Sequence, residues 1–272
     1  MPLTWFAHQV PVLGMKLARP RWFEATALCV GSMTPDLMYA FSAYLRVDTH
    51  RFPAAFVVGI PFAVVLAVIV RRVLAPVGPA QLPDVGRLQL RSYAVLASRR
   101  PHVAVTTTCA TLGIGSHIVL DWFTHPGRPG VRWLGYDDTA VTAFGVTEPL
   151  AGVLQLIGHS FGSLIGLALL ALIGRRRLLE DWYGVDAVEA SRVWRPSTRQ
   201  RSVFWATSVA GLFAGGLWGA GGDQIEFIQR TFVGIMLGSI VGAVAVRRVG
   251  RVPTRSARQG PERATATPSA VR

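Results

Sequence analysis

Residues 52–70 read FPAAFVVGIPFAVVLAVIV, a run without a single charged or amide side chain. A helix of about 20 such residues is long enough to cross the hydrocarbon core of a bilayer. Comparable runs occupy residues 103–121, 150–174, 203–221 and 231–246. Two weaker candidates, interrupted by proline and polar residues, occupy residues 3–18 and 22–44. The sequence therefore predicts an all-α, polytopic integral membrane bundle of about five to seven transmembrane helices.

The overall composition supports a membrane protein over a soluble one. Hydrophobic residues make up 51% of the chain and charged residues only 16%, against about 25% charged in ordinary globular domains. The net charge of +13 would also suit a nucleic-acid-binding protein, but the basic residues lie in short loops and a tail between the apolar runs. This distribution is typical of membrane topology, so we expect no nucleic-acid partner.

The arginine distribution predicts the orientation in the membrane. Twenty of the 28 basic residues fall in three segments, residues 71–102, 175–202 and 247–272. Cytoplasmic loops carry an excess of Lys and Arg, so we expect these three segments, including the C-terminal tail, to be cytoplasmic. We expect residues 1–250 to form one membrane-embedded domain. Residues 251–272, which lack any hydrophobic periodicity, should form a disordered basic tail.

The stretch GSHIVLDWFTH, residues 115–125, carries the strongest functional signal. Its His117, Asp121 and His125 are spaced four residues apart, so one helical stripe would present all three. The predicted topology brings this stripe to the extracytoplasmic end of its helix. The same level of the bundle should hold four further titratable residues, namely His8, Asp36, His50 and His159.

Five histidines and two aspartates form the ligand set of a zinc or similar divalent site, and a cluster of this size could hold more than one ion. Taken singly, each member has a simpler explanation. A lone membrane histidine often hydrogen-bonds a neighbouring helix, and an aspartate at a helix end is often a cap. His102, at the opposite end of its helix, is not part of the predicted cluster.

Two other patterns have weaker functional interpretations. Residues 158–162, GHSFG, match the nucleophile elbow of serine hydrolases, but that motif needs a strand, a sharp turn and a helix. Here it lies inside an apolar helical run, and no histidine follows it. The glycines of residues 211–222 follow no predicted strand, so we expect them to allow close helix packing instead of binding a dinucleotide.

Several motifs together resemble a known family. VGSMTPDLMY around Asp36, DTHRF around His50, GSHIVLDWFTHPG and GHSFGSL occur in an order similar to that of the DUF4184 family of uncharacterised bacterial membrane proteins. These proteins are in turn similar to YdjM-type inner-membrane proteins described as metal-dependent hydrolases. The resemblance covers roughly residues 1–250 and implies a multi-pass protein of the bacterial inner membrane.

A more distant similarity is to the zinc-dependent phospholipase C and P1 nuclease superfamily, helical enzymes with a three-zinc cluster. This resemblance implies a similar metal-binding helical core. It implies one ion held by Asp36, His50, His117 and Asp121, with Asp121 bridging to a second ion that His8 binds. His125 and His159 would hold a third. The superfamily has a glutamate ligand one turn after its last histidine, where this chain has Ser163, so the bridged pair is the safer prediction.

Such a centre predicts a metal-dependent hydrolase. Two bridged cations would activate a water molecule and polarise a phosphoryl or acyl oxygen. Asp36 could serve as a ligand or as the base that orients the water, and Arg51 and Arg128 are candidate anion clamps. The expected substrate is a phosphoester in a lipid or a lipid-linked molecule at the extracytoplasmic face. Two alternatives remain open, a membrane protein that transports or senses a divalent metal and a structural protein with a buried polar network.

Overall fold

A computed structural model describes residues 4–45 and 47–252, and these residues are mostly helical, which confirms the all-α class. The longer helices are α1 (Thr4–Ala18), α2 (Ala25–Met38), α5 (Gly59–Ile69), α7 (Val103–Trp122), α9 (Leu150–Arg175), α12 (Thr198–Gly219) and α13 (Gln224–Val249). The shorter helices and single 3-10 or π turns are η1 (Tyr39–Phe41), α3 (Ser42–Leu45), α4 (Ala54–Val57), η2 (Val70–Leu74), α6 (Gly78–Gln81), η3 (Gly86–Leu88), η4 (Leu90–Ser98), α8 (Pro129–Trp133), α10 (Leu178–Tyr183) and α11 (Val185–Arg192).

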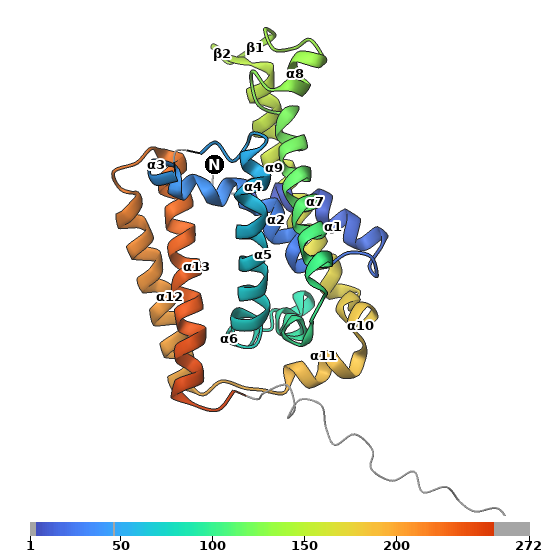
Figure 1. Cartoon of the computed structure of the whole chain (residues 1–272), viewed down its shortest axis with the longest axis vertical. Coiled ribbons are helices and arrows are strands. Elements are labelled where there is room, and N and C mark those ends of the chain that lie inside the picture. Colours follow the sequence, from blue (N-terminus) through green and yellow to red (C-terminus); the bar gives the residue numbers. More distant parts are fainter. Residues whose placement is uncertain (1–3, 46, 253–272) are drawn as a thin grey trace, which may run out of the picture.

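One small sheet accompanies the helices. Strands β1 (Ala140–Ala143) and β2 (Val146–Pro149) pair antiparallel, with Ala140 opposite Pro149. The sequence analysis did not predict this hairpin. It projects beyond the end of α7 and α9 (Figure 1).

Four helical segments are long and apolar enough to cross a membrane. They are Ala54–Leu74, which joins α4, α5 and η2, together with α7, α9 and α13. Each corresponds to a run predicted from the sequence. The fifth strong run lies in α12, which has 22 residues and pairs with α13, but the four spans do not include it. The predicted number of five to seven spans therefore stays a prediction.

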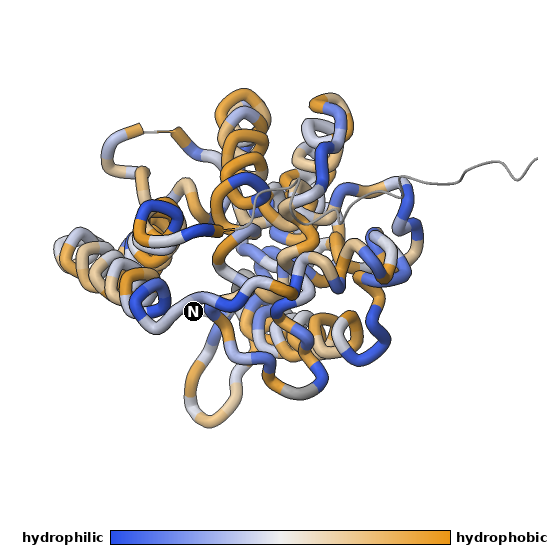
Figure 2. The backbone as a smooth tube through the Cα atoms, turned by 90° about the horizontal axis from the view of Figure 1, so that it is seen from below, coloured by the Kyte–Doolittle hydropathy of each residue, from blue (hydrophilic) through white to orange (hydrophobic). Residues whose placement is uncertain are grey.

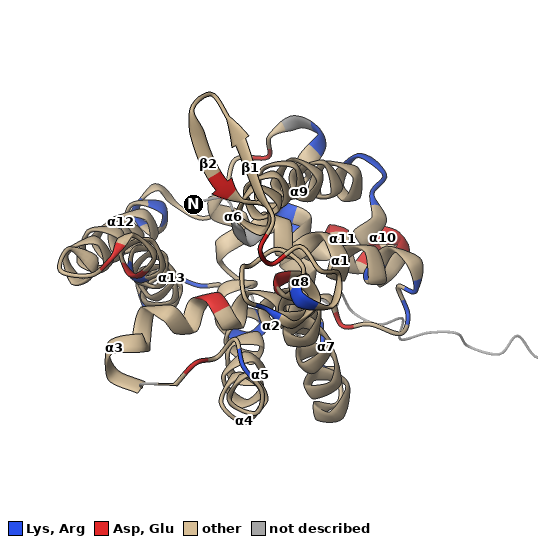
Figure 3. Ribbon diagram, turned by 90° about the horizontal axis from the view of Figure 1, so that it is seen from above, with Lys and Arg blue, Asp and Glu red and all other residues tan. Residues whose placement is uncertain are grey.

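Helices α5, α7, α9, α12 and α13 run roughly parallel, and the connections between them lie at two opposite ends of the molecule (Figure 1). The connections that contain α6, η4, α10 and α11 all lie at the end opposite the β hairpin. Figure 2, which looks onto that opposite end, shows hydrophobic helices joined by hydrophilic loops. Figure 3, which looks from the hairpin end, shows charged segments mainly at loops and helix ends. The end opposite the hairpin therefore carries the arginine-rich segments 71–102 and 175–202.

Glycine allows the closest helix contacts in the bundle. On α2, the Cα of Gly31 lies against the backbone of Ala110 on α7, and Gly113 on α7 lies against the backbone of Leu28. Between the paired helices α12 and α13, Gly211 and Gly234 face each other closely, so a side chain at either position would overlap backbone atoms of the other helix. This is the close packing that small residues provide between membrane helices, and it confirms the predicted packing role for Gly211, Gly215 and Gly219, whereas Gly221 has open space around it.

Helices α1, α2, α7 and α9 form the centre of the molecule. Helix α1 packs along α9, where Gly162 and Gly166 meet the backbone of α1. Glu24 caps the N-terminus of α2, and its carboxylate accepts hydrogen bonds from the amides of Thr26 and Ala27. Cys109 is buried in the main apolar core, and Cys29 packs against that core as a second free thiol. Both cysteines therefore serve as packing residues. These four helices carry most of the predicted metal ligands.

The predicted disordered tail, residues 251–272, lies outside the described residues except for its first two positions.

Candidate metal centre

All seven predicted ligands come together at one place in the structure. They come from α1, α2, the loop before α4, the C-terminal part of α7, the turn after it, and α9. In chain order they are His8, Asp36, His50, His117, Asp121, His125 and His159. Five of them are buried, whereas Asp36 and His125 are partly exposed. Segments up to 150 residues apart in the sequence thus contribute to one cluster of imidazoles and carboxylates.

Four of these residues place ligand atoms close together around the Nε2 atoms of His50 and His117. His117 Nε2 lies 3.3 Å from Asp121 Oδ2, 3.3 Å from His50 Nε2 and 3.6 Å from Asp36 Oδ1. His50 Nε2 lies 3.3 Å from Asp36 Oδ1 and 3.7 Å from Asp121 Oδ2. Ligands about 2.0 Å from a zinc ion at the corners of a tetrahedron are about 3.3 Å apart. Five of the six distances among these four atoms are therefore near those of a four-coordinate site, and His50, His117 and Asp121 are close enough together to share one ion.

The hydrogen bond on the far side of His117 fixes which ring nitrogen faces the cluster. His117 Nδ1 lies 2.7 Å from the backbone carbonyl of Ser32. A carbonyl only accepts, so Nδ1 carries a proton, and Nε2 is the ring nitrogen that faces the cluster. A backbone partner of this kind commonly orients a metal-binding histidine. Two carboxylate oxygens and this nitrogen thus face one point, and a cation at that point would satisfy them together.

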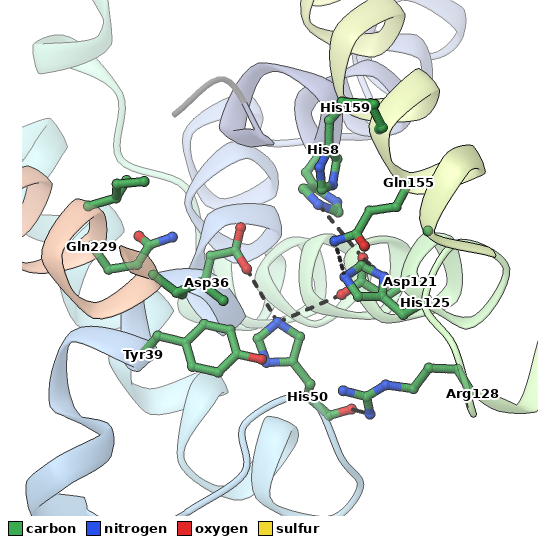
Figure 4. A pocket seen from close by; sticks show the side chains of 14 residues that line it. His8, Asp36, Tyr39, His50, Asp121, His125, Arg128, Gln155, His159 and Gln229 are labelled. Atoms are coloured by element: carbon green, nitrogen blue, oxygen red, sulfur yellow. Dashed lines mark hydrogen bonds and ion pairs between the residues drawn. The ribbon is translucent and has the colours of Figure 1, made fainter. Parts of the chain in front are cut away.

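Asp121 has its two carboxylate oxygens directed to different neighbours. Oδ2 faces the four-residue set, whereas Oδ1 lies 3.8 Å from His8 Nε2 and 3.5 Å from His125 Nδ1. Among residues 4–45 and 47–252, no hydrogen-bond partner faces the buried Oδ1. An orphaned buried acceptor of this kind is rare and costly. The arrangement fits a carboxylate that bridges two cations, which is the role that the resemblance implied. Figure 4 shows His8, His50 and His125 directed toward Asp121.

His125 lies just beyond α7, at the more open side of the cluster. Its Nε2 is 2.7 Å from the side-chain amide of Gln155 on α9, and Thr124 Oγ1 is 3.1 Å from its Nδ1. Burial lowers the pKa of His125 below its ordinary value, with Asp121 opposing this effect. The ring is therefore neutral near pH 7, which is the form that binds metal.

A third ion has less support in the geometry than the first two. The ring centroids of His125 and His159 are 6.3 Å apart, and those of His8 and His159 are 5.8 Å apart. Among the described residues, the groups close enough to share one ion are His8 with Asp36 and His117, and His50 with His117 and Asp121. Ser163, one turn after His159, is buried but offers no carboxylate. The third site implied by the resemblance stays a prediction.

A cavity of about 410 Å³ gives access to the cluster. Six of the seven predicted ligands line it, and His117, whose side chain is fully buried, lies beneath its floor. The cavity is also lined by Tyr39, Arg128, Gly152, Gln155, Leu156, Ile225, Ile228 and Gln229. Because Leu156 is on α9 and the last three are on α13, the cavity lies between two membrane-spanning helices. Its walls combine apolar side chains with a few polar groups, as ligand pockets usually do.

Tyr39 is a site residue that the sequence analysis missed. Its ring stacks on His50, with centroids 4.6 Å apart. Burial raises the pKa of Tyr39 to about 12, and the charges of Asp36 and Asp48 contribute to the rise. The phenol therefore stays protonated and can donate a hydrogen bond into the cavity. Tyr39 and Gln155 are common residue types without a repeating pattern, so no sequence signal marked them.

The two predicted anion clamps have different surroundings. Arg128 lines the cavity, and its guanidinium donates a hydrogen bond to the backbone carbonyl of His50 at 3.4 Å. Arg51 does not line the cavity. Its side chain is 75% exposed and pairs with Asp48 at 2.9 Å. His102, which the prediction excluded, lies at the other end of α7 and caps its first turn.

The GHSFG pentapeptide lies within the continuous helix α9. Ser160 is exposed, and its helical backbone lacks the sharp turn of a nucleophile elbow. This agrees with the low weight given to the serine hydrolase interpretation.

Comparison with known proteins supports one of the resemblances seen in the sequence. No curated protein and no solved structure matches the chain. These comparisons give no further support for the similarity to YdjM-type hydrolases or to the phospholipase C and P1 nuclease superfamily. A family model described as a domain of unknown function matches residues 1–248. The chain belongs to this family, DUF4184.

Proposed function

We propose that this protein is a membrane-bound, metal-dependent hydrolase that acts on a phosphoester or lipid-linked substrate at the extracytoplasmic face of the bacterial inner membrane. The observation that carries the proposal is the close spacing of His50, His117 and Asp121, with Asp36 next to His50, beside an accessible cavity. A packing network would have no need of an adjoining cavity. It would also be expected to satisfy Asp121 Oδ1 with a donor, and that oxygen has none in the part of the chain that the structure describes.

The donor set favours zinc. Three or four imidazole nitrogens with one or two carboxylates, closely spaced and mostly buried, suit this borderline-soft ion better than magnesium or calcium, which prefer oxygen ligands. Bound divalent ions would lower the pKa of a water molecule toward neutrality and polarise a phosphoryl oxygen.

The protein's own side chains would divide the remaining work. Asp36 has the highest carboxylate exposure in the cluster, at 13% of its side chain, so it can accept a proton from water in the cavity. Tyr39 donates through its protonated hydroxyl, and Arg128 adds a positive charge at the cavity wall. These two donors are suited to holding a phosphate oxygen.

The apolar part of the cavity supports a lipid substrate. Leu156 on α9 faces the cavity together with Ile225 and Ile228 on α13. Both helices are candidate membrane spans, so a substrate could keep its acyl chains in the bilayer while its headgroup reaches Asp36. A free polar metabolite would gain little from these walls.

The first test is metal content. We would measure zinc by mass spectrometry in detergent-purified wild type, Asp121→Ala and His102→Ala, all supplied with zinc. We expect close to two ions per chain in wild type and in His102→Ala, whose ring lies at the far end of α7, and close to none in Asp121→Ala. Absence of bound metal from all three would overturn the proposal in favour of a structural network.

The second test is catalysis. The loaded wild type would be assayed for release of phosphate or a phosphorylated headgroup from phospholipid vesicles, beside Asp36→Asn. Stoichiometric metal with no turnover of any phosphoester would instead favour the alternative in which the cluster transports or senses metal.

A further inference from the structure

Gln229 is a polar residue on a membrane-spanning helix, and its side chain lines the cavity beside the metal cluster. It lies on α13, one of the four candidate spans, and is only 5% exposed. Among the described residues, its side-chain carbonyl Oε1 has no hydrogen-bond partner. Buried polar groups without partners are rare, and polar side chains within membrane spans are costly and often functional. The proposed hydrolysis so far leaves this amide without a role.

Neighbouring contacts hold this part of α13 in one orientation. Arg230 Nε donates to the carbonyl of Ala40 at 3.1 Å, and the same guanidinium pairs with Glu226 at 2.9 Å. Glu226 in turn accepts a hydrogen bond from the Ser42 hydroxyl, so these contacts tie α13 to η1 and α3. The α13 residues that line the cavity are Ile225, Ile228 and Gln229. Their spacing of three and four residues places them on one helix face, which the ion pair keeps directed at the cavity.

The amide of Gln229 differs in its surroundings from the other cavity amide, that of Gln155. Gln155 already contacts His125 Nε2 at 2.7 Å. Figure 4 shows the amide nitrogen of Gln229 on the side of Asp36, a carboxylate that accepts, and its oxygen on the other side. The terminal torsion of glutamine is soft, so a small rotation presents this oxygen to a ligand in the cavity. Gln229 therefore offers the cavity a hydrogen-bond acceptor that is fixed by its helix.

An acceptor at this position selects among headgroups. Phosphate and ester oxygens only accept at neutral pH, so the partner of Oε1 must be a hydroxyl or an ammonium group of the substrate. A quaternary ammonium has no N–H and is recognised by aromatic cages, whereas Tyr39 is the one aromatic side chain besides the histidines among the described residues that line the cavity. Any ammonium would also be repelled by the proposed divalent ions and by Arg128. A neutral hydroxyl is the donor that fits.

We propose that Gln229 Oε1 accepts a hydrogen bond from a headgroup hydroxyl of the substrate, so that the site prefers phospholipids whose headgroup is a polyol such as glycerol. This inference rests on the proposed function, since it takes the substrate to be a lipid phosphoester. Tyr39 and Arg128 then hold the phosphate oxygens, and Gln229 holds the hydroxyl. Gln229 is thus a specificity-determining residue that α13 contributes to a site built mainly from other helices.

The test is lipid binding to the zinc-loaded full-length protein in neutral detergent, measured by native mass spectrometry. The probes are phosphatidylglycerol and phosphatidylpropanol with the same acyl chains, which carry the same charge and differ in the headgroup hydroxyls. The variant is Gln229→Met, which keeps an unbranched side chain and removes the amide. The matched control is Gln224→Met, an exposed residue of the same helix outside the cavity lining. Intact lipid and its hydrolysis product differ in mass, so binding and turnover are measured separately.

We expect wild type and Gln224→Met to bind phosphatidylglycerol about 10-fold more tightly than phosphatidylpropanol, the effect of one buried hydrogen bond. Gln229→Met should bind both lipids as wild type binds phosphatidylpropanol. A structural role for Gln229 would instead weaken both lipids in parallel, and that result would overturn the proposal.

Equal binding of the two lipids by wild type would also overturn it, whether or not the variant folds. This outcome together with turnover of both lipids would reject the role of Gln229 and leave the hydrolase standing. A hydroxyl preference that depends on Gln229, without turnover of either lipid, would support the role of Gln229 in binding and count against the hydrolase.

Discussion

Zinc should stabilise the folded protein, and Asp121→Asn should remove most of that stabilisation. Asp121 touches four histidines at 3.3 to 3.8 Å, and its side chain is 6% exposed. The substitution keeps the shape of the side chain but removes the negative charge that both proposed ions share. A ligand present at 100 times its dissociation constant stabilises the folded state by about 2.7 kcal/mol. For a chain of this size, this corresponds to a rise in Tm of about 5–11 °C.

The assay is thermal unfolding of the purified protein in detergent, monitored by tryptophan fluorescence, first with a chelator and then with excess zinc. Wild type should show the full rise in Tm, and Asp121→Asn should show little. His102→Ala is the control, because its ring caps the other end of α7 and should leave the zinc-dependent rise unchanged.

The reasoning would be refuted if wild type melted at the same temperature with zinc and with chelator. A buried hydrogen-bonded network without metal predicts that outcome. In that case Asp121→Asn would destabilise the protein by a similar amount with and without zinc, by about 3–5 kcal/mol if it removes one partner of a buried ion pair.

Three further substitutions test other parts of the structure. Gly234→Leu should destabilise the paired helices α12 and α13 by about 1–3 kcal/mol or more, because the side chain would overlap the backbone of the facing helix; the same change at Gly216, where an added Cβ would make only an ordinary contact of 3.9 Å with Thr231 Oγ1, should have a smaller effect in a thermal unfolding assay. Gln155→Ala should weaken binding of one zinc ion about 10- to 100-fold, because His125 loses the amide that orients its ring; a calorimetric titration that still shows two sites of unchanged affinity would contradict this. Arg71→Gln should destabilise the protein by about 3–5 kcal/mol, because it leaves the buried carboxylate that caps α2 without its partner; simultaneous replacement of that carboxylate by an amide should restore much of the loss in chemical denaturation.

The spans and the site were predictable from the sequence for the same physical reason. Charged and polar side chains are expensive in an apolar chain, so the runs without them mark the membrane spans, and the few titratable residues within them mark the site. His117 and Asp121 interrupt an otherwise apolar stretch, and the structure brings them against residues from four other segments. The order of these residues along the chain was informative because the apolar runs contain few other titratable side chains.

Other features depend on tertiary contacts that the sequence does not encode locally. Glycine, serine and threonine lower the hydropathy of α12, so composition alone leaves its membrane crossing open even though it pairs along α13. Arg51 follows His50 in the sequence, yet it turns outward to Asp48 and does not reach the cavity. The cavity-facing isoleucines of α13 became site residues only because α13 lies across the cavity from α9. Tyr39 became one because its ring stacks on His50 at the cavity wall.

The helix packing and the metal ligands are coupled at one crossing. Gly113 on α7 lies one turn before His117, and it contacts the backbone of Leu28 and the amide nitrogen of Ser32 on α2. This contact brings the two backbones close enough for His117 Nδ1 to reach the Ser32 carbonyl at 2.7 Å. Any side chain at position 113 would push α7 away from α2 and lengthen that bond. The ring of His117 would then lose the partner that keeps its Nε2 directed at Asp36 and Asp121. The glycine that builds the fold is therefore also a positioning residue for the proposed metal centre.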